Sequence, residues 1–407
     1  MSVPATHWTR GRPVPGDLLD VLLARAALLF DVSGYRQGFV VGVMSFVGFL
    51  GGGVLGARAA PVLADSNALA ELPRPAVGLG VVFLTATLGQ LLATLLGAEV
   101  RNRMTWRPAR TLDAFGGALV SVVSLLLVAW LIGTAVASSP FPALASQVRN
   151  SVVLQQVDAV VPTPVERFFG AFRRLVDDRG FPEVFGGLAP TEVTEVEAPD
   201  PALANSPVVQ EAQPSVLKIT GVAESCRRRI EGTGFVYAPE RVMTNAHVVA
   251  GVTEPLVEVG DRSLAARVVL FDPGRDLAVL AVPGLRRPQL EFAGPAPPGA
   301  SAIVVGYPQS GPFRPDPARI RGTQRARGPD IYREQTVVRE IYALRGTVRP
   351  GNSGGPLLDD AGNVLGVVFA AAADDPQTGY ALTAAEVVGQ AQAGAAASAR
   401  ADTRTCD

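Results

Sequence analysis

The chain has 407 residues, which is enough for two or three domains. Its 36 lysine and arginine residues are balanced by 37 acidic ones, giving a net charge of −1. This excludes the strongly basic surface that nucleic-acid binding requires, so we expect no nucleic-acid partner. Apolar residues make up 48 % of the sequence and gather in its first third.

Four apolar segments lie near the N-terminus. The first, residues 18–30, is short and contains Asp20 and Arg25. The other three are residues 38–60, 76–96 and 114–137. Each of these is long enough to cross a bilayer, which takes about 20 residues. One such run could be a buried core helix, but three in succession predict a membrane domain. We therefore predict an all-α membrane module over residues 1–140, with four transmembrane helices, or three if the first segment does not span.

The loop between the third and fourth apolar segments is rich in arginine. It carries Arg101, Arg103, Arg107 and Arg110. Positive loops stay on the cytoplasmic side, so everything after the fourth segment is expected on the extracytoplasmic (periplasmic) side. This holds whether or not the first segment spans. Glycines in the second segment would let helices pack closely; they are Gly42, Gly48, Gly51, Gly52 and Gly53.

The run Gly34-Tyr-Arg-Gln-Gly-Phe39 follows the first apolar segment. It resembles the colicin V production (CvpA) family of four-helix membrane proteins. The resemblance covers the membrane part only, and it implies a CvpA-like domain at residues 1–140.

Residues 141–205 form a connecting segment. Within it, residues 161–175 start with turn residues and then place apolar side chains on one helical face; these are Phe168, Phe169, Phe172 and Leu175. Such a helix would lie at the membrane surface or pack on the following domain. Residues 189–207 are rich in Pro, Ala, Glu and Thr without periodicity, which predicts a flexible spacer.

Residues 206–407 alternate short β-rich runs with Gly, Pro and Asp turns, a pattern typical of an all-β antiparallel domain. The first set of predicted strands is 215–220, 234–238, 241–245, 256–259, 267–271 and 277–282. The second set is 302–307, 331–338, 341–348, 356–358, 364–370 and 379–382. The arginine-rich residues 314–327, between the first two strands of the second set, could steer acidic substrates but are expected to be a solvated loop. Thr383 is expected to cap a closing helix.

Three motifs in this domain suggest nucleophilic catalysis. Ser353 lies in the glycine-rich run G-N-S-G-G-P-L, which suits a nucleophile beside an oxyanion hole. His247, in T-N-A-H-V-V, is the only histidine besides His7 and so the only plausible base. Asp276 opens the run D-L-A-V-L, where it could orient the imidazole. Each alone has a bland interpretation: a tight turn, a core histidine, a solvated aspartate. Together, in the order His, Asp, Ser, they predict a catalytic triad.

These motifs resemble the signatures of trypsin-like serine proteases of the bacterial HtrA type, over roughly residues 210–395. The runs Gly232-Thr-Gly-Phe-Val236 and Val304-Val-Gly-Tyr-Pro308 resemble strands of that group. The resemblance implies a fold of two β-barrels with the active site between them, and an oxyanion hole made by the N–H groups of Gly351 and Ser353. By analogy, the specificity pocket is expected at Thr347, Phe369, Ala370 and Ala371.

A CvpA-like part followed by such a protease resembles the actinobacterial membrane-anchored acid-resistance serine proteases (MarP-like). This implies a serine endopeptidase that cleaves envelope proteins during acid and oxidative stress. Too little chain follows Ser353 for a PDZ domain, so we expect a monomeric protease domain. Two alternatives are a non-cleaving sensor or scaffold, and a CvpA-like transport component with a regulatory protease. The sequence suggests no cofactor and no metal site.

The chain has two cysteines, Cys226 and Cys406, both in the C-terminal part. They could be two free buried thiols or one disulfide. An oxidising compartment, such as the extracytoplasmic side predicted above, favours the disulfide.

Overall fold

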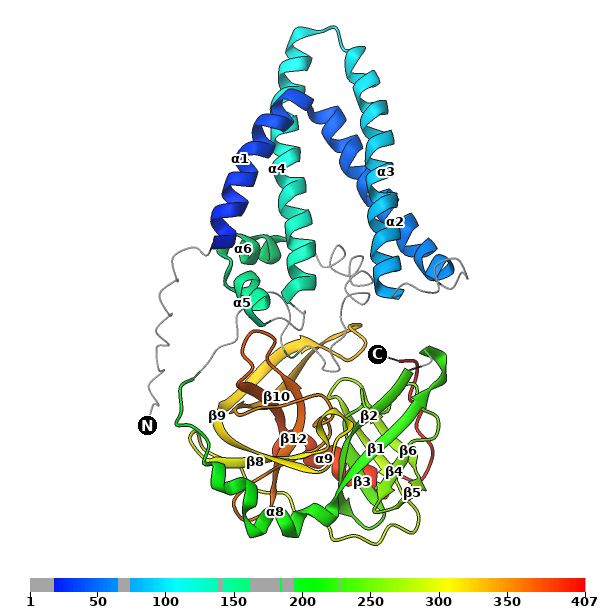
Figure 1. Ribbon diagram of the computed structural model, residues 1–407, viewed down its shortest axis with the longest axis vertical. Coiled ribbons are helices and arrows are strands. Elements are labelled where there is room, and N and C mark those ends of the chain that lie inside the picture. The colour runs from blue at the N-terminus through cyan, green and yellow to red at the C-terminus, as the bar shows by residue number, and fades with distance from the viewer. Residues whose placement is uncertain are drawn as a thin grey trace, which may run out of the picture. The chain divides into compact units, whose positions relative to one another are not determined.

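The computed structural model describes residues 18–64, 74–137, 142–161, 184, 194–226 and 228–406. It divides into two compact units, Met1–Asp178 and Arg179–Asp407. The first unit is helical and the second is built mainly from β-strands (Figure 1). The predicted fold class, an all-α module joined to an all-β domain, is therefore confirmed.

Four long helices form most of the first unit: α1 (Leu18–Gln37), α2 (Phe39–Ala64), α3 (Arg74–Asn102) and α4 (Arg107–Ala137). Figure 1 shows α1 lying along α4 and α2 lying along α3. Among the described residues, three stretches are long and apolar enough to cross a membrane: Phe39–Ala60, Gly80–Asn102 and Arg107–Ala137. These are the three stronger predicted spans. The remaining long helix, α1, which covers the weakest predicted segment, is not among the stretches that are long and apolar enough to span.

Glycines let α2 and α3 approach closely. A Cβ at Gly48 would meet the backbone of Gly89, and one at Gly52 would meet the backbone of Thr85. Any side chain at these positions would push the helices apart. Gly51 instead faces open space. Of the five glycines named above, Gly48 and Gly52 have the predicted role; a Cβ at Gly42 or Gly53 would make only ordinary contacts with Val120 or Ala86.

An ion pair joins the two corners of the helical unit. Arg101 Nε donates to Asp113 Oδ2 at 2.8 Å, and Arg101 Nη1 donates to the carbonyl of Arg36 at 2.6 Å. The other oxygen of Asp113 accepts from the N–H of Val40 at 2.9 Å. The α1–α2 corner and the α3–α4 corner therefore lie at the same end of this unit.

Two short helices, α5 (Pro142–Asn150) and α6 (Val152–Val160), pack against α4. Trp130 Nε1 donates to Asp158 Oδ1 at 2.7 Å. Asp20, near the start of α1, accepts from Ser151 Oγ at 2.5 Å and from Val152 N at 3.0 Å. The helical module thus extends beyond the predicted boundary at residue 140. The amphipathic helix predicted at residues 161–175 falls outside the described residues, except for Val161.

The described part of the predicted spacer lies on the second unit. Arg321, which is buried, donates from Nη1 to the carbonyl of Thr194 at 2.8 Å, and Arg345 donates to the carbonyl of Val196. Three short helical segments follow: η2 (Pro201–Asn205), α8 (Pro207–Ala212) and η3 (Gln213–Ser215). The structure therefore differs from the expected free spacer starting at residue 189 and from the domain start at residue 206. Backbone carbonyls make these contacts, and composition does not reveal where a carbonyl binds.

The second unit contains two antiparallel sheets. The first has seven strands in the order β5-β4-β1-β2-β3-β7-β6. Its strands are β1 (Val216–Ala223), β2 (Arg228–Ala238), β3 (Arg241–Thr244), β4 (Leu256–Val259), β5 (Arg262–Ala265), β6 (Arg267–Asp272) and β7 (Leu277–Ala281). In β7 every residue is buried, and in the register Met243 opposes Val279. Of the seven strands of this sheet, only β5 was absent from the prediction.

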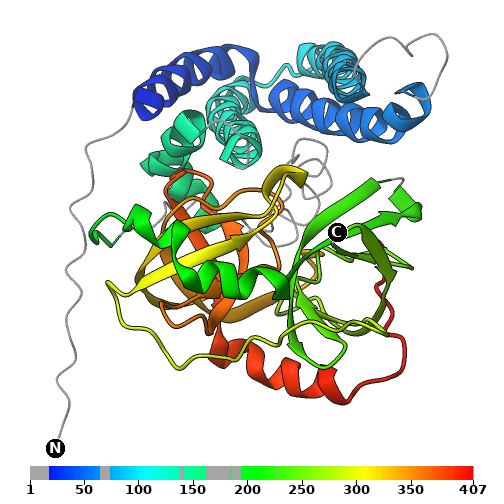
Figure 2. The same ribbon diagram turned by 60° about the horizontal axis from the view of Figure 1, so that its bottom comes forward.

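The second sheet is a closed barrel in the order β10-β13-β12-β11-β8-β9. Its strands are β8 (Ser301–Gly306), β9 (Arg314–Pro329), β10 (Thr336–Arg345), β11 (Pro356–Leu358), β12 (Val364–Ala371) and β13 (Thr378–Thr383). The helix α9 (Ala384–Ala396) follows, and the Thr383 hydroxyl caps it as predicted by accepting from Glu386 N. Figure 2 shows α9, which contacts strands of both sheets.

The arginine-rich residues 314–327 are a strand and not the predicted loop. They form most of β9, which pairs with β8 and β10. Burial alternates along this strand, with Ala318 and Ile320 inward. The sequence did not reveal this alternation, because its many arginines suggested a solvated segment. Some of their guanidinium groups instead bind backbone; Arg319, for example, donates to the carbonyl of Gly299 at 2.8 Å. The strand predicted at residues 331–338 is mostly a turn preceding β10.

Cys226 and Cys406, which are 180 positions apart in the sequence, form a disulfide. In the chain-entropy model, closing so long a loop stabilises the folded state by up to about 5 kcal/mol. The bond fixes a C-terminal tail that already contacts the first sheet. Gly251 N donates to the carbonyl of Thr403 at 3.0 Å, and Ala401 N donates to the carbonyl of Val268 at 2.9 Å.

Candidate active site

Ser353 lies on a tight turn between β10 and β11, at the junction of the two sheets. The turn contains Gly351 (φ +94°) and Gly354 (φ +81°), conformations that other residues rarely adopt. A Cβ at Gly354 would also collide with the carbonyl of Thr233 on β2. Ser353 is buried, and within the described ranges its hydroxyl makes no hydrogen bond. The predicted nucleophile therefore has a hydroxyl that is not committed to holding the fold.

His247 follows β3 and is held by Asp276, which precedes β7. The Nδ1 atom of His247 lies 2.8 Å from Asp276 Oδ2, and the backbone N–H of His247 donates to Asp276 Oδ1 at 2.9 Å. A carboxylate only accepts hydrogen bonds, so the proton of a neutral imidazole sits on Nδ1. This leaves Nε2 as the basic nitrogen, the arrangement that a triad requires.

Asp276 is fully buried and has a backbone φ of +60°, which is unusual for an aspartate. Its carbonyl accepts from Asn245 Nδ2 at 2.8 Å. Such a conformation persists only where the surroundings determine it, and it is typical of functional positions.

The segments that carry Ser353 and His247 both contact strand β2. The N–H of Thr233 on β2 donates to the carbonyl of Ser353 at 2.8 Å. A Cβ at the preceding Gly232 would meet the side chain of Val248 and the carbonyl of Ser353. The structure therefore brings the serine turn and the segment that follows the histidine together beside Gly232.

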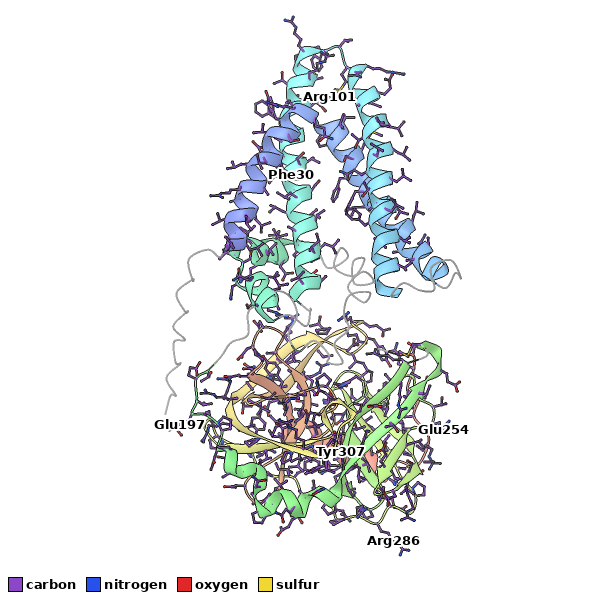
Figure 3. All side chains as sticks on the ribbon, in the orientation of Figure 1. Phe30, Arg101, Glu197, Glu254, Arg286 and Tyr307 are labelled. Carbon is purple, nitrogen blue, oxygen red and sulfur yellow. A yellow bond between two sulfur atoms is a disulfide. The ribbon has the colours of Figure 1, made fainter. Side chains whose placement is uncertain are left out.

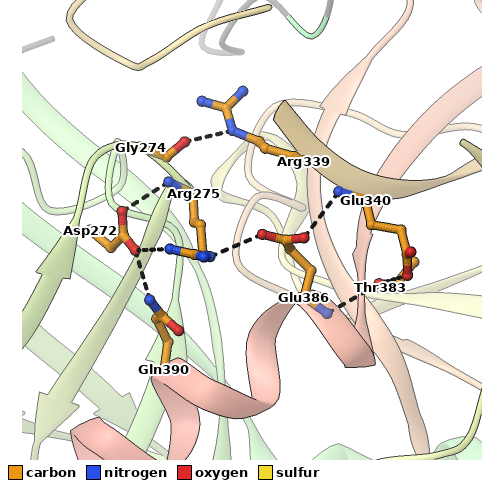
Figure 4. Close-up of polar contacts among 8 residues, drawn as sticks. All are labelled: Asp272, Gly274, Arg275, Arg339, Glu340, Thr383, Glu386 and Gln390. Atoms are coloured by element: carbon orange, nitrogen blue, oxygen red, sulfur yellow. Dashed lines mark hydrogen bonds and ion pairs between the residues drawn. The ribbon is translucent and has the colours of Figure 1, made fainter. Parts of the chain in front are cut away.

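The turn leading to Asp276 is braced by α9, as Figure 4 shows. Arg275 Nε donates to Glu386 Oε1 at 2.9 Å, and Gln390 Nε2 donates to Asp272 Oδ2 at 2.9 Å. Glu386 in turn accepts from Glu340 N at 3.1 Å. The helix after the second barrel thus fixes a turn of the first sheet.

Arg339 on β10, whose side chain is buried, also binds this turn. Its Nε donates to the carbonyl of Gly274 at 2.7 Å and its Nη2 to the carbonyl of Pro329 at 3.0 Å. Burial lowers the pKa of the Arg339 guanidinium, while nearby carboxylates, Asp276 first among them, act in the opposite direction. An arginine stays charged even so, so a buried cation lies near the carboxylate of Asp276. Sequence reasoning missed it, because an arginine on a strand is ordinarily solvated.

We expect Arg339→Met to destabilise the protein by about 3 kcal/mol, because two buried carbonyls lose a charged donor. Arg275→Met is the matched control. Arg275 is half exposed and its ion pairs are worth about 1 kcal/mol or less. Urea unfolding of both variants checks this expectation. Equal losses of stability in the two variants would contradict it.

The four residues of the predicted specificity pocket differ in their exposure to solvent. Phe369 and Ala370 are fully buried in the hydrophobic core that the two sheets share. Thr347 and Ala371 are half-buried. Phe369 and Ala370 are therefore part of the core packing in this structure. The pocket assignment of Thr347 and Ala371 stays a prediction.

Across the part of the chain that the structure describes, no group of three or more His, Cys, Asp or Glu side chains could hold a metal ion.

Comparison with protein families gives two matches. A model of the trypsin-like peptidase domain matches residues 232–367, and a model of the Colicin V production protein matches residues 19–162. The second match includes α5 and α6, which the sequence analysis had assigned to the connecting segment.

Individual proteins resemble the whole chain or its protease part. "Serine protease Rv3671c" of Mycobacterium tuberculosis is 42% identical over 379 residues, covering 92% of this chain and 95% of that protein. A "Probable periplasmic serine endoprotease DegP-like" of Pseudomonas savastanoi is 30% identical over 194 residues, 43% of this chain and 39% of that protein. The crystal structure of the Rv3671c protease in its active form has a TM-score of 0.52 and 50% identity, covering 55% of this chain and 99% of that one.

Proposed function

Because this chain belongs to the family of serine proteases that join a CvpA-like membrane domain to a trypsin-like domain, we propose that Ser353, His247 and Asp276 are its catalytic triad. The observation that carries the proposal is the double contact of Asp276 with the ring and the backbone of His247. A buried serine hydroxyl without a structural hydrogen bond, on the adjoining turn, supports it.

The mechanism follows from these roles. Ser353 Oγ attacks the peptide carbonyl while His247 Nε2 takes its proton. Asp276 stabilises the imidazolium that forms. The tetrahedral oxyanion is held by the N–H groups of Gly351 and Ser353, and no hydrogen bond among the described residues engages either group otherwise. His247 then protonates the leaving amine, and water resolves the acyl-enzyme.

The protease domain is assigned to the extracytoplasmic side. The arginines between α3 and α4 favour the cytoplasm. The bond from Arg101 to the carbonyl of Arg36 places the α1–α2 corner at that same end and adds Arg36 to its positive charge. The C-terminal end of α4 would then lie across the membrane, and the disulfide suits an oxidising compartment.

Maleimide labelling of intact cells tests this orientation. Its readout is clean because both native cysteines are in the disulfide. We expect a membrane-impermeant maleimide to label Asp360→Cys, on the protease domain, in intact cells. Arg103→Cys, in the exposed α3–α4 loop, should react only after the membrane is opened. The reverse pattern would place the protease in the cytoplasm.

Within this location, envelope proteins are the proposed substrates, with the protease domain acting as a monomer. We further propose a role in acid and oxidative stress, which rests on the family resemblance alone. Survival of acid exposure by cells whose only copy carries Ser353→Ala tests it. Survival equal to wild type would separate the protease activity from stress resistance.

A further inference from the structure

Thr233 on β2 is fully buried directly behind the serine turn. Its hydroxyl donates to the carbonyl of Gly351 at 2.6 Å and accepts from the N–H of Tyr307 at 3.0 Å. Its own N–H donates to the carbonyl of Ser353 at 2.8 Å. One residue of the first sheet thus contacts both residues whose N–H groups form the proposed oxyanion hole.

The turn at residues 349–352 decides where the Gly351 N–H points. Asn352 N donates to the carbonyl of Arg349 at 2.9 Å, and Gly351, in the third position, has a φ of +94°. With Pro350 in the second position, this is a type II turn. Type I and type II turns differ by a flip of their central peptide, and here that peptide carries the Gly351 N–H. The turn type therefore determines whether that donor faces the oxyanion.

One contact holds the central peptide directly, and a second fixes the Gly351–Asn352 peptide that follows it. The carbonyl of Pro350 accepts from Gln309 N at 2.7 Å, and the carbonyl of Gly351 accepts from Thr233. Gln309 lies in the segment after β8 that begins at Tyr307 (labelled in Figure 3), the residue whose N–H binds the Thr233 hydroxyl. The Thr233 hydroxyl therefore connects the turn at residues 349–352 to the 307–311 segment that holds the Pro350 carbonyl.

The 307–311 segment has an unusual backbone conformation. Gln309 and Ser310 have φ values of 54° and 59°, in the left-handed region that non-glycine residues avoid. The first sheet holds it in place. Lys218 Nζ donates to the carbonyl of Ser310 at 3.2 Å, and the Tyr307 hydroxyl donates to the carbonyl of Val216 at 3.1 Å.

From these contacts we propose that Thr233 is a positioning residue for the oxyanion hole. Its hydroxyl fixes the Gly351 carbonyl on one side of the central peptide and the 307–311 segment, whose Gln309 N–H binds the Pro350 carbonyl of that peptide. Together these contacts keep the Gly351 N–H aimed at the oxyanion. Thr233 does not touch substrate, because it is fully buried behind the turn. Oxyanion donors act by being oriented in advance, so losing this hydroxyl weakens transition-state binding more than substrate binding. The proposal rests on the proposed triad.

Thr233→Val tests it in the purified full-length chain, because valine matches threonine in shape and lacks the hydroxyl. We expect kcat for a peptide substrate to fall about tenfold to a hundredfold with KM nearly unchanged, less than for outright removal of an oxyanion donor. The inhibition constant of a peptide boronate, whose adduct places an oxygen in the oxyanion hole, should rise by a similar factor. Thr233→Ser, which keeps the hydroxyl, should restore both values.

Thr244→Val is the matched control. Thr244 is also fully buried, and its hydroxyl donates to the carbonyl of Thr233 at 2.7 Å. It lies beside Gly354 but makes no hydrogen bond, among the described residues, to the turn at residues 349–352. It should lose stability but keep its kcat. Equal kcat in Thr233→Val and wild type, an effect on KM alone, or equal losses in both valine variants would overturn the proposal. If Thr233→Val does not fold, Thr233→Ala carries the same expectations. An inactive wild type would instead refute the triad.

Discussion

Replacing Ser353 by alanine is expected to lower kcat for peptide hydrolysis by about six orders of magnitude, since a triad without its nucleophile retains little more than substrate binding. The fold should survive. The Ser353 hydroxyl makes no hydrogen bond among the described residues, so its removal leaves no buried group unsatisfied. Thermal unfolding should therefore shift by the equivalent of less than about 1 kcal/mol.

Ser215→Ala provides the opposite control. Ser215 is fully buried, and its hydroxyl donates to the carbonyl of Pro288 at 2.8 Å, away from the site. This variant should lose about 1 kcal/mol of stability and keep its activity. Hydrolysis by Ser353→Ala near the wild-type rate would remove Ser353 from the mechanism.

Asp276→Asn is expected to lower kcat about ten-thousandfold at neutral pH. Both carboxylate oxygens of Asp276 accept hydrogen bonds from His247, one from the backbone N–H and one from the ring. An asparagine has only one oxygen, so its NH₂ group must face one of these two nitrogens. If it faces the ring, Nδ1 becomes the acceptor and the proton moves to Nε2. Nε2 can then no longer take the proton of Ser353.

Asp272→Asn separates this effect from a general loss of charge. Asp272 lies in the same turn and accepts from Arg275 and Gln390, but it does not bind His247. Its activity should stay within about fivefold of wild type, because partly exposed ion pairs are worth little. The pH dependence of kcat/KM in both variants is the measurement. Comparable losses in the two would show that Asp276 acts only through the turn.

The sequence supported most of the fold because its patterns are local. The apolar runs predicted the three spanning stretches, and alternation predicted most strands. The same reasoning mispredicted the arginine-rich strand β9 as a loop. Its guanidinium groups bind the backbone of residues distant in sequence, such as Thr194 and Gly299. A solvated loop and such a strand have the same composition.

The residues of the candidate site likewise include some that the sequence predicted and some that it did not. Ser353, His247 and Asp276 lie in recognisable motifs, so residue types alone suggested their roles. Arg339 and Thr233 act through contacts to carbonyls of the opposite sheet. Nothing in the local sequence indicates which carbonyl a buried donor will reach, so these two positions needed the structure.

The central claim is that Ser353 is the nucleophile of a working triad, and mapping a fluorophosphonate adduct tests it most directly. The full-length protein is labelled and the modified residue is identified by mass spectrometry, beside His247→Ala. We predict one adduct, on Ser353, and none in His247→Ala. Peptide hydrolysis by a protein that carries no adduct on Ser353, or an adduct on another serine, would contradict the account.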